Sequence, residues 1–165
     1  MKELFTTLYR YGEWANRHLL AKARVLTPAQ LGQRVSKGSE PILPTFGHLV
    51  GADLRWLHRW QGQTPPTVAV ADFTSLDVVQ RRWDEVCASR RAYLQSLDET
   101  ALLATIRWSR DSGPVDLPRW HALMQCANHG TQHRAELAAM LTDFGQSPGD
   151  LDFMVFSLEQ IGIRG

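Results

Sequence analysis

The sequence has few cysteines, no surplus of either charge and no long apolar run. Cys87 and Cys126 are the two cysteines in 165 residues, which excludes a disulfide framework. Both fall in helix-like segments, which indicates buried or free thiols in a reducing compartment. No stretch approaches the roughly 18 apolar residues that cross a bilayer. The N-terminal residues lack the apolar core of a signal peptide, so we expect a cytoplasmic protein without a membrane segment.

The charge balance disfavours nucleic acid as a partner. Lys and Arg number 18, Asp and Glu number 17, and the net charge is +1. Nucleic-acid binding depends on neutralising many phosphates, and only Arg81, Arg82, Arg90 and Arg91 approach a basic patch. A hydrophobic content of 44% with 21% charged residues is ordinary for a globular protein. We expect a single domain over residues 1–165.

Hydrophobic periodicity predicts an all-α fold. Apolar residues recur at helical spacing over residues 3–25, 41–60, 75–97 and 118–144, and a short fifth helix is expected within 149–162. Thr27 and Pro28 end the first helix, Thr74 or Ser75 caps the third, Asp116 caps the fourth and Gly145 ends it. Residues 104–117 read as an irregular segment or a hairpin with its turn at 111–114. Four long helices with short connections favour a four-helix bundle.

Two histidines on the fourth predicted helix stand in an apolar stripe. His129 and His133 share that stripe with Cys126, Leu137 and Met140. The i, i+4 spacing lets two imidazoles converge on one metal ion, and apolar surroundings favour the neutral form that a metal needs. The alternative is a pair of half-buried histidines hydrogen-bonded to neighbouring groups.

The third ligand of such a site stays open on the residues alone. A catalytic metal site commonly has three protein ligands, and His121 lies two turns from His129, too far to share the ion. His18 and His58 neighbour charged residues and are expected to be exposed. His48 stands between small residues that would let another helix approach, but the helical wheel places it opposite the apolar stripe of its own helix, which indicates a surface position.

Three segments resemble the DinB/YfiT-like family of helical-bundle metalloenzymes. They are residues 11–16 (YGEWAN), residues 45–56 (TFGHLVGADLRW) with 59–62 (RWQG), and residues 128–137 (NHGTQHRAEL). The resemblance covers nearly the whole chain. It implies a four-helix bundle and a homodimer formed through helix faces. It also implies that His48, His129 and His133 hold one divalent ion per chain, Zn²⁺ or Ni²⁺, with water at the open positions.

The resemblance leaves two classes of function. Some relatives use low-molecular-weight thiols, as S-transferases or as a thiol-dependent isomerase, and others are known only as damage-inducible proteins. The first class is a metal-dependent transferase or hydrolase, in which a metal-bound thiol or water loses a proton and attacks a small electrophile in a crevice between helices. The second is a non-catalytic metal-binding bundle of the stress response that acts through a partner.

Further side chains are candidates for supporting roles. Glu136 is either a general base or an acceptor for a ligating histidine, or else a solvated glutamate paired with a basic neighbour. Asp53 and Arg55 either orient His48 and bind substrate or form an ordinary surface ion pair. Cys126 could serve as a ligand or nucleophile, but packing as a small apolar residue is the simpler interpretation. Trp108, in the irregular segment, is expected to cover a substrate pocket, and the other tryptophans singled out are assigned to the core or a dimer interface: Trp56, Trp60, Trp83 and Trp120.

Overall fold

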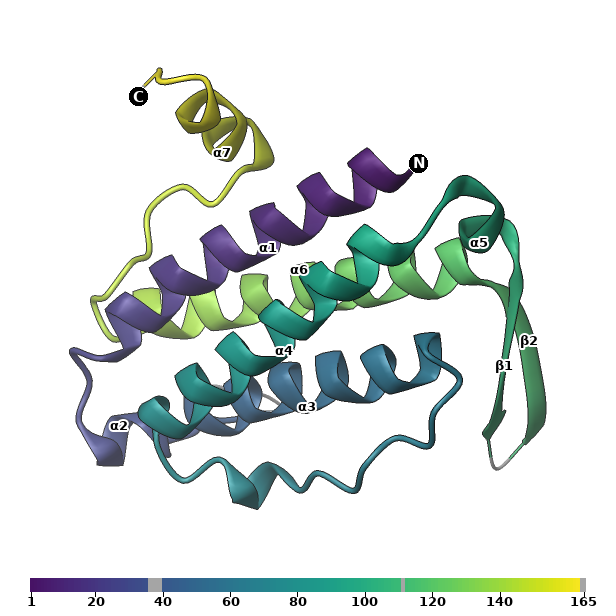
Figure 1. Cartoon of the computed structure of the whole chain (residues 1–165). Helices are drawn as coiled ribbons and strands as arrows, with labels where there is room; N and C mark the ends of the chain where they lie inside the picture. The colour runs from purple at the N-terminus through teal and green to yellow at the C-terminus, as the bar shows by residue number, and fades with distance from the viewer. Residues whose placement is uncertain (36–39, 111, 164–165) are drawn as a thin grey trace.

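The fold is mostly helical with one small two-stranded sheet, as Figure 1 shows. The computed structural model describes residues 1–35, 40–110 and 112–163. The long helices are α1 (Lys2–Ala23), α3 (Ile42–Trp60), α4 (Leu76–Ser96) and α6 (Arg119–Asp143). The shorter elements are α2 (Pro28–Leu31), the 3₁₀ turn η1 (Val70–Asp72), α5 (Glu99–Leu103), β1 (Thr105–Arg110), β2 (Gly113–Pro118) and α7 (Phe153–Gln160). The helical class predicted from periodicity is confirmed.

The four long helices surround a shared interior. Helices α1 and α3 each contact both α4 and α6. Each helix turns an apolar stripe inward because burial of that stripe is the main favourable term in folding. The largest fully buried side chains come from α1, α3, α4, α5 and α6 and include Phe5, Leu19, Phe46, Trp60, Val79, Leu102, Leu123 and Leu137.

Local signals place most helix ends correctly. The Ser75 side chain accepts a hydrogen bond from the Val78 backbone N–H and caps α4. Gly145 follows α6 with φ of 73°, a conformation that glycine adopts without steric cost. Two short helices were not predicted. Thr27 does more than end α1, because it forms a capping box with Gln30 that starts α2, and Asp98 caps α5 in the same way as Ser75 caps α4.

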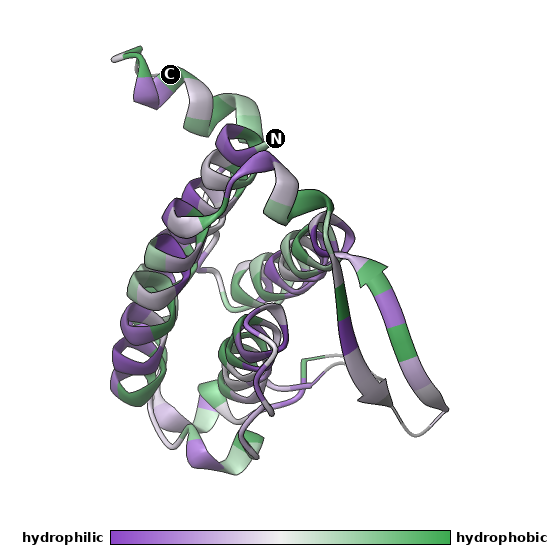
Figure 2. Cartoon of the chain, turned by 45° about the vertical axis from the view of Figure 1, so that its right-hand side comes forward, coloured by the Kyte–Doolittle hydropathy of each residue, from purple (hydrophilic) through white to green (hydrophobic). Residues whose placement is uncertain are grey.

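Residues 105–118 form an antiparallel hairpin, which confirms one of the two interpretations of this segment. Its register pairs Trp108 with Val115 and Ile106 with Leu117, and Figure 2 shows apolar and polar residues alternating along β2. Residue 111 of the predicted turn lies outside the described residues. The prediction that Asp116 caps α6 was wrong, because its carboxylate accepts two hydrogen bonds from Arg107 across the hairpin at 2.5 and 2.6 Å.

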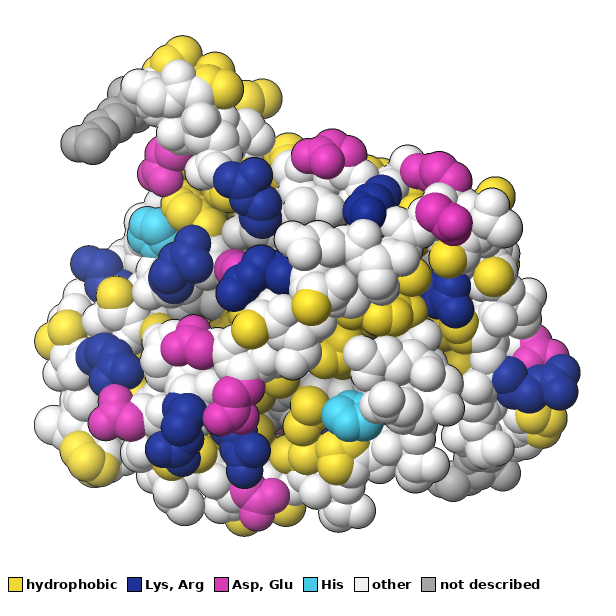
Figure 3. Space-filling view, viewed as in Figure 1, with side chains coloured by type: hydrophobic (Ala, Val, Ile, Leu, Met, Phe, Trp, Pro, Cys, Tyr) yellow, Lys and Arg dark blue, Asp and Glu magenta, His cyan; other side chains and the backbone are white. Residues whose placement is uncertain are grey.

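Helix α7 lies against α1 at the edge of the molecule. Its Phe156 is 3% exposed and packs on Tyr11 and Trp14 of α1, with ring centroids 5.8 Å apart in both pairs. The other side of α7 is exposed, with Met154 62% exposed, and Ile161, the residue after the helix, is 71% exposed. Figure 3 shows hydrophobic side chains gathered on this projecting segment. None of the helices in the described part of the chain combines the length and apolar character that a bilayer crossing requires.

Candidate metal centre

Three imidazoles meet where α3 packs against α6. The Nε2 atom of His129 lies 3.2 Å from Nε2 of His48 and 3.2 Å from Nε2 of His133. One potential ligand atom from each ring lies within 4.8 Å of the other two. Histidines 129 and 133 are neighbours because they are one turn apart on α6, and His48 joins them because α3 and α6 are in contact. All three side chains are half-buried.

The position of His48 differs from the prediction made from the helical wheel. That prediction assumed one buried face, but α3 is covered on more than one side. Gly47 accommodates the Phe73 ring, since a Cβ there would lie 2.8 Å from a ring carbon, and α6 covers the adjacent side. His48 therefore lies between two covered sides of α3 and faces α6. Gly47 thus makes room for the Phe73 side chain, whereas the small residues beside His48 were expected to let another helix approach.

The spacing of the nitrogens fits a shared ion better than mutual hydrogen bonding. Two imidazole nitrogens that bind one tetrahedral ion at ~2.0–2.1 Å are separated by roughly 3.3 Å. The observed Nε2–Nε2 separations are both 3.2 Å. A neutral imidazole Nε2 either donates or accepts, so a proton on His129 can satisfy one of its two neighbours and not both. The three residues therefore fit a divalent cation.

Burial keeps two of the rings neutral. It lowers the pKa of His48 and of His129 below the ordinary value of 6.5, and the neighbouring His133 lowers both further. A metal ion binds only the neutral imidazole, so these shifts reduce competition from protons near neutral pH.

Glu136 contacts the cluster through His133. Its Oε2 lies 2.6 Å from Nδ1 of His133, and its Oε1 accepts a hydrogen bond from Gln132 at 3.3 Å. With the proton on Nδ1, His133 donates to the carboxylate and turns the lone pair of Nε2 toward the cluster. Partial burial raises the pKa of Glu136, but the hydrogen bonds from His133 and Gln132 outweigh it and lower the pKa below its ordinary value. The partner of the Glu136 carboxylate is thus His133 of the cluster, and not a separate basic residue on the surface.

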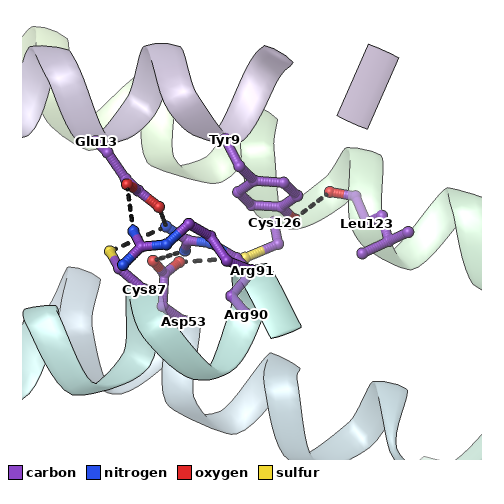
Figure 4. Close-up of polar contacts among 8 residues, drawn as sticks. All are labelled: Tyr9, Glu13, Asp53, Cys87, Arg90, Arg91, Leu123 and Cys126. Carbon is purple, nitrogen blue, oxygen red and sulfur yellow. Dashed lines mark hydrogen bonds and ion pairs between the residues drawn. The ribbon is translucent and has the colours of Figure 1, made fainter. Parts of the chain in front are cut away.

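Asp53 and Cys126 belong to a buried polar network next to the cluster, drawn in Figure 4. Asp53 accepts a hydrogen bond from Arg90 at 2.6 Å and one from the Cys126 thiol at 3.2 Å. The alternative prediction, a surface ion pair between Asp53 and Arg55, is therefore wrong. Burial raises the pKa of the Cys126 thiol well above its ordinary value, and the described metal-ligand cluster does not include it. This supports the packing role of Cys126 over the reactive one.

Arg55 lies on the same side of α3 as His48, seven residues further on. Its guanidinium folds back along the helix, where a Cβ on Gly51 would lie 3.2 Å from Nη1. No hydrogen bond or ion pair joins Arg55 to a carboxylate of the described chain. After burial and His133, its charge is a further cause of the lowered pKa of His48. Arg55 thus places a positive charge beside the cluster.

The other histidines stay apart from the cluster. The prediction that His18 and His58 are exposed was wrong, because both side chains are half-buried. Nδ1 of each lies 2.9–3.0 Å from the carbonyl oxygen four residues earlier in its own helix. His121 is exposed and its ring lies 4.0 Å from that of Trp120, between centroids. Of the tryptophans, Trp60 and Trp83 are buried as predicted. Trp56 and Trp120 are half-buried against the same core, and together with Trp108, which was expected to cover a pocket, they line a cleft on the outside of α3 and α6.

Two arginines, Arg90 and Arg134, are buried; Arg90 therefore cannot belong to the surface basic patch considered from the sequence, and no role was predicted for Arg134. Arg90 is 3% exposed and binds Asp53 and Glu13. It occupies an inward position of α4, seven residues after Trp83, and a charged residue at an apolar stripe position is a signal for a buried ion pair. Arg134 is also buried, and a Cβ on Gly130 would lie 2.8 Å from its Nη1. The guanidinium thus passes close over the backbone of Gly130, and a side chain at that position would require it to shift.

Comparison with known proteins bears on the family and the fold of the chain. The model of the DinB family matches residues 1–162. "Protein DinB" of Bacillus subtilis (strain 168) is 23% identical over 163 residues, which cover 94% of this chain and 95% of that protein. A solved structure, "Crystal structure of the conserved protein of locus from Enterococcus faecalis", aligns with a TM-score of 0.61 at 11% identity. It covers 84% of this chain and 93% of that one, and it supports the fold alone.

Proposed function

The chain belongs to the DinB family, and on that premise we propose that it binds one divalent ion per chain through His48, His129 and His133. The observation that carries this proposal is the convergence of three Nε2 atoms from two helices. Imidazole ligands suit Zn²⁺ and Ni²⁺, which we propose as the ions. The four long helices would form a four-helix bundle of the DinB/YfiT type, in a single domain.

We further propose that the site serves a metal-dependent enzyme, a thiol S-transferase. A bound divalent ion would lower the pKa of a thiol or water at its open positions. The positive charge of Arg55 would stabilise an anionic thiolate beside the cluster. The thiolate sulfur of a low-molecular-weight thiol would then form a bond to the electrophilic carbon of a small substrate, and the leaving group would depart with its electron pair.

Glu136 suits a positioning role better than that of general base. Its lowered pKa keeps it ionised near neutral pH and makes it a weak proton acceptor. Its hydrogen bond to Nδ1 of His133 would instead fix the orientation and tautomer of that ring.

The homodimer stays a prediction. The exposed apolar side chains of Met154 in α7 and of Ile161 directly after it are the surface that supports it. Sedimentation equilibrium at micromolar concentration would test it, and a monomer throughout that range would reject it.

Metal analysis of the purified chain tests the proposed site. We expect close to one Zn²⁺ or Ni²⁺ per chain, and a loss of affinity of at least about 100-fold in His48→Ala, His129→Ala and His133→Ala, because each removes a direct ligand. Glu136→Gln is expected to weaken binding by about 10- to 100-fold. His121→Ala removes a histidine of the same helix outside the cluster and should change nothing. Full metal content in His129→Ala would contradict the three-histidine site.

The enzyme proposal has its own test. Turnover is measured with a panel of low-molecular-weight thiols and alkyl or aryl halides, before and after chelation. We expect chelation to abolish turnover and the added ion to restore it. Turnover that survives chelation would reject the metal-dependent mechanism while leaving the metal site intact.

A further inference from the structure

One positive charge beside the three-histidine cluster has no carboxylate partner in the described part of the chain. It belongs to Arg55, which is half-buried on α3. Two carboxylates of the neighbourhood are engaged by other groups. Asp53, two residues earlier on the helix, binds Arg90, and the carboxylate at the cluster, Glu136, binds His133. Among the described residues no ion pair or hydrogen bond joins Arg55 to either of them, so its guanidinium is available to a ligand.

Gly51 leaves room for the guanidinium of Arg55 against the helix. A Cβ on Gly51 would lie 3.2 Å from Nη1 of Arg55 and 3.5 Å from Cγ1 of Val68, which belongs to the loop after α3. The side chain of Arg55 therefore folds back along α3 by about one turn, to a place next to this loop. A side chain at position 51 would require the guanidinium to shift.

The folded-back position brings the charge of Arg55 toward the cluster. Gly51 follows His48 by three residues, and side chains three apart on a helix have Cβ atoms about 5–6 Å apart. Nη1 of Arg55 therefore lies within roughly 9 Å of the Cβ of His48. After burial and the neighbouring imidazoles, the charge of Arg55 is a further cause of the lowered pKa of both His48 and His129. It thus acts on histidines of both helices that form the cluster.

The charges at the cluster favour a ligand that carries more than one negative charge. Three neutral imidazoles add no charge to a bound divalent ion, and in the described chain Glu136 is the one carboxylate hydrogen-bonded to them. The ion and Arg55 therefore leave an excess of positive charge that Glu136 does not balance. A positive charge beside a cation site also weakens binding of the ion, because like charges repel. A ligand that brings a negative charge to Arg55 offsets this cost.

We propose that Arg55 forms a carboxylate subsite of the metal centre. The ligand would bind the ion with one donor atom, such as a thiolate sulfur, and place a carboxylate on the guanidinium of Arg55 through a short carbon chain. The planar guanidinium presents paired N–H donors whose spacing matches the two oxygens of a carboxylate. This inference deepens the proposed function and rests on it, because the ligand is held by the ion at one end and by Arg55 at the other.

Binding of two matched thiols to the Co²⁺-loaded full chain tests the subsite. 3-Mercaptopropionate carries the carboxylate, and 3-mercapto-1-propanol replaces the carboxylate with an uncharged hydroxymethyl group. Imidazole sites that suit Zn²⁺ also accept Co²⁺, and the absorption bands of a thiolate bound to Co²⁺ report binding of either probe. We expect 3-mercaptopropionate to bind at least about tenfold more tightly than the alcohol, because a charge-assisted hydrogen bond to Arg55 adds to the bond with the ion.

Four variants assign this preference for the carboxylate to its residues. Arg55→Gln should reduce the preference to about twofold or less. Arg55→Lys should give an intermediate value, since a lysine keeps the charge but not the paired donors. Gly51→Ala keeps every charge but requires the guanidinium to shift, so its preference should also fall between those of the unaltered chain and Arg55→Gln. Arg82→Gln removes an exposed arginine of α4 and should leave the preference unchanged.

Metal binding without a thiol separates the subsite from a structural role of Arg55. Arg55→Gln should bind Co²⁺ about twofold or more tightly than the unaltered chain, because a like charge near the ion is removed. A merely structural arginine would instead weaken binding of the ion together with both thiols.

Two results would overturn the subsite: a preference for the carboxylate that persists in Arg55→Gln, or weaker Co²⁺ binding by that variant. Either result leaves the proposed metal site intact. A chain that binds no Co²⁺ would contradict the metal site itself and the subsite with it, so the two failures are distinguishable.

Discussion

His129 is the residue on which the candidate metal centre depends most. Its Nε2 lies 3.2 Å from the Nε2 atoms of both other histidines, whose rings also contact each other with centroids 4.7 Å apart. Its ring is half-buried, and burial lowers its pKa below 6.5. The pKa of His48 is lowered in the same way, so burial favours the neutral, metal-binding form of both rings.

Metal affinity and the stability of the metal-free chain should both fall as the pH drops below about 6.5. In the folded chain the pKa values of His48 and His129 are lowered, chiefly by burial, whereas the unfolded chain has the ordinary value of 6.5. Between the two values the unfolded chain binds more protons, so stability rises with pH in this window and is fully present above about 6.5. Urea titration and competitive metal titration from pH 7.5 to 5 measure the two effects.

A matched variant separates these rings from the rest of the chain. The double variant His48→Gln, His129→Gln should lose most of this pH dependence of stability, whereas His121→Gln should keep it. An unchanged pH dependence in the double variant would contradict the assignment of the dependence to the cluster.

At the residue scale, the sequence pattern predicted part of the site. The pair His129 and His133 follows from helical spacing alone, because i, i+4 neighbours meet on any helix. His48 did not follow from periodicity, since its position depends on Phe73 and α6 covering adjacent sides of α3. It was assigned only through the family resemblance, and its role as a ligand stays a prediction. The buried partners of Asp53 could not be predicted, because α3 and α4 meet only in three dimensions.

Helix α4 is joined to α1 and α3 by one buried guanidinium. Arg90 binds Asp53 of α3 at 2.6 Å and Glu13 of α1 at 3.3 Å, and lies 4.5 Å from the centroid of the Tyr9 ring. Burial alone would lower its pKa, but the Asp53 carboxylate and the neighbouring Cys87, Tyr9 and Cys126 together more than offset this and raise the pKa above its ordinary value. Arg90 therefore stays charged inside the helical core.

Removing this charge should destabilise the fold strongly. Arg90→Met leaves the Asp53 and Glu13 carboxylates without their buried partner, and we expect a loss of about 3–5 kcal/mol in the free energy of unfolding. The neighbouring Arg91 is 52% exposed and also binds Glu13, at 2.8 Å. Arg91→Met is the control and should cost about 1 kcal/mol or less. The free energy of unfolding is measured by urea denaturation. An equal decrease in the two variants would contradict the prediction that the buried ion pairs of Arg90 stabilise the fold more than the exposed one of Arg91.

At the element scale, length and strong periodicity decided what was predictable. The four long helices were placed within two or three residues because each carries an apolar stripe over several turns. Helices α2 and α5 were missed because they hold only four and five residues and depend on the caps Thr27 and Asp98. The hairpin was favoured by its turn residues, but the capping role of Asp116 failed because Arg107 is its partner across the strands.

For the whole molecule, the cluster links two helices that are distant in sequence. His48 of α3 is 81 residues from His129 of α6. An ion that binds both would favour the folded state over the unfolded one, because the unfolded chain does not bring the ligands together.

Chelation should therefore lower the Tm. At a free ion concentration about a thousandfold above the Kd, we expect the loaded chain to melt about 10 °C above the metal-free chain. Differential scanning calorimetry with and without added Zn²⁺ measures this shift. His129→Ala should show a shift of no more than about 2 °C under the same conditions. If the Tm of His129→Ala rose as much on adding Zn²⁺ as that of the unaltered chain, the stabilising ion would bind at another site.

The hairpin has a consequence for how the chain can diversify. Among the described residues, strands β1 and β2 pair with each other alone, and Ile106 is their one buried side chain in the helical core. Exchanging Trp108 or Val115 would reshape one wall of the cleft beside α3 and α6 while the helices that carry the histidines keep their places. That wall and the three-histidine cluster are thus encoded in separate stretches of the chain, which can vary independently.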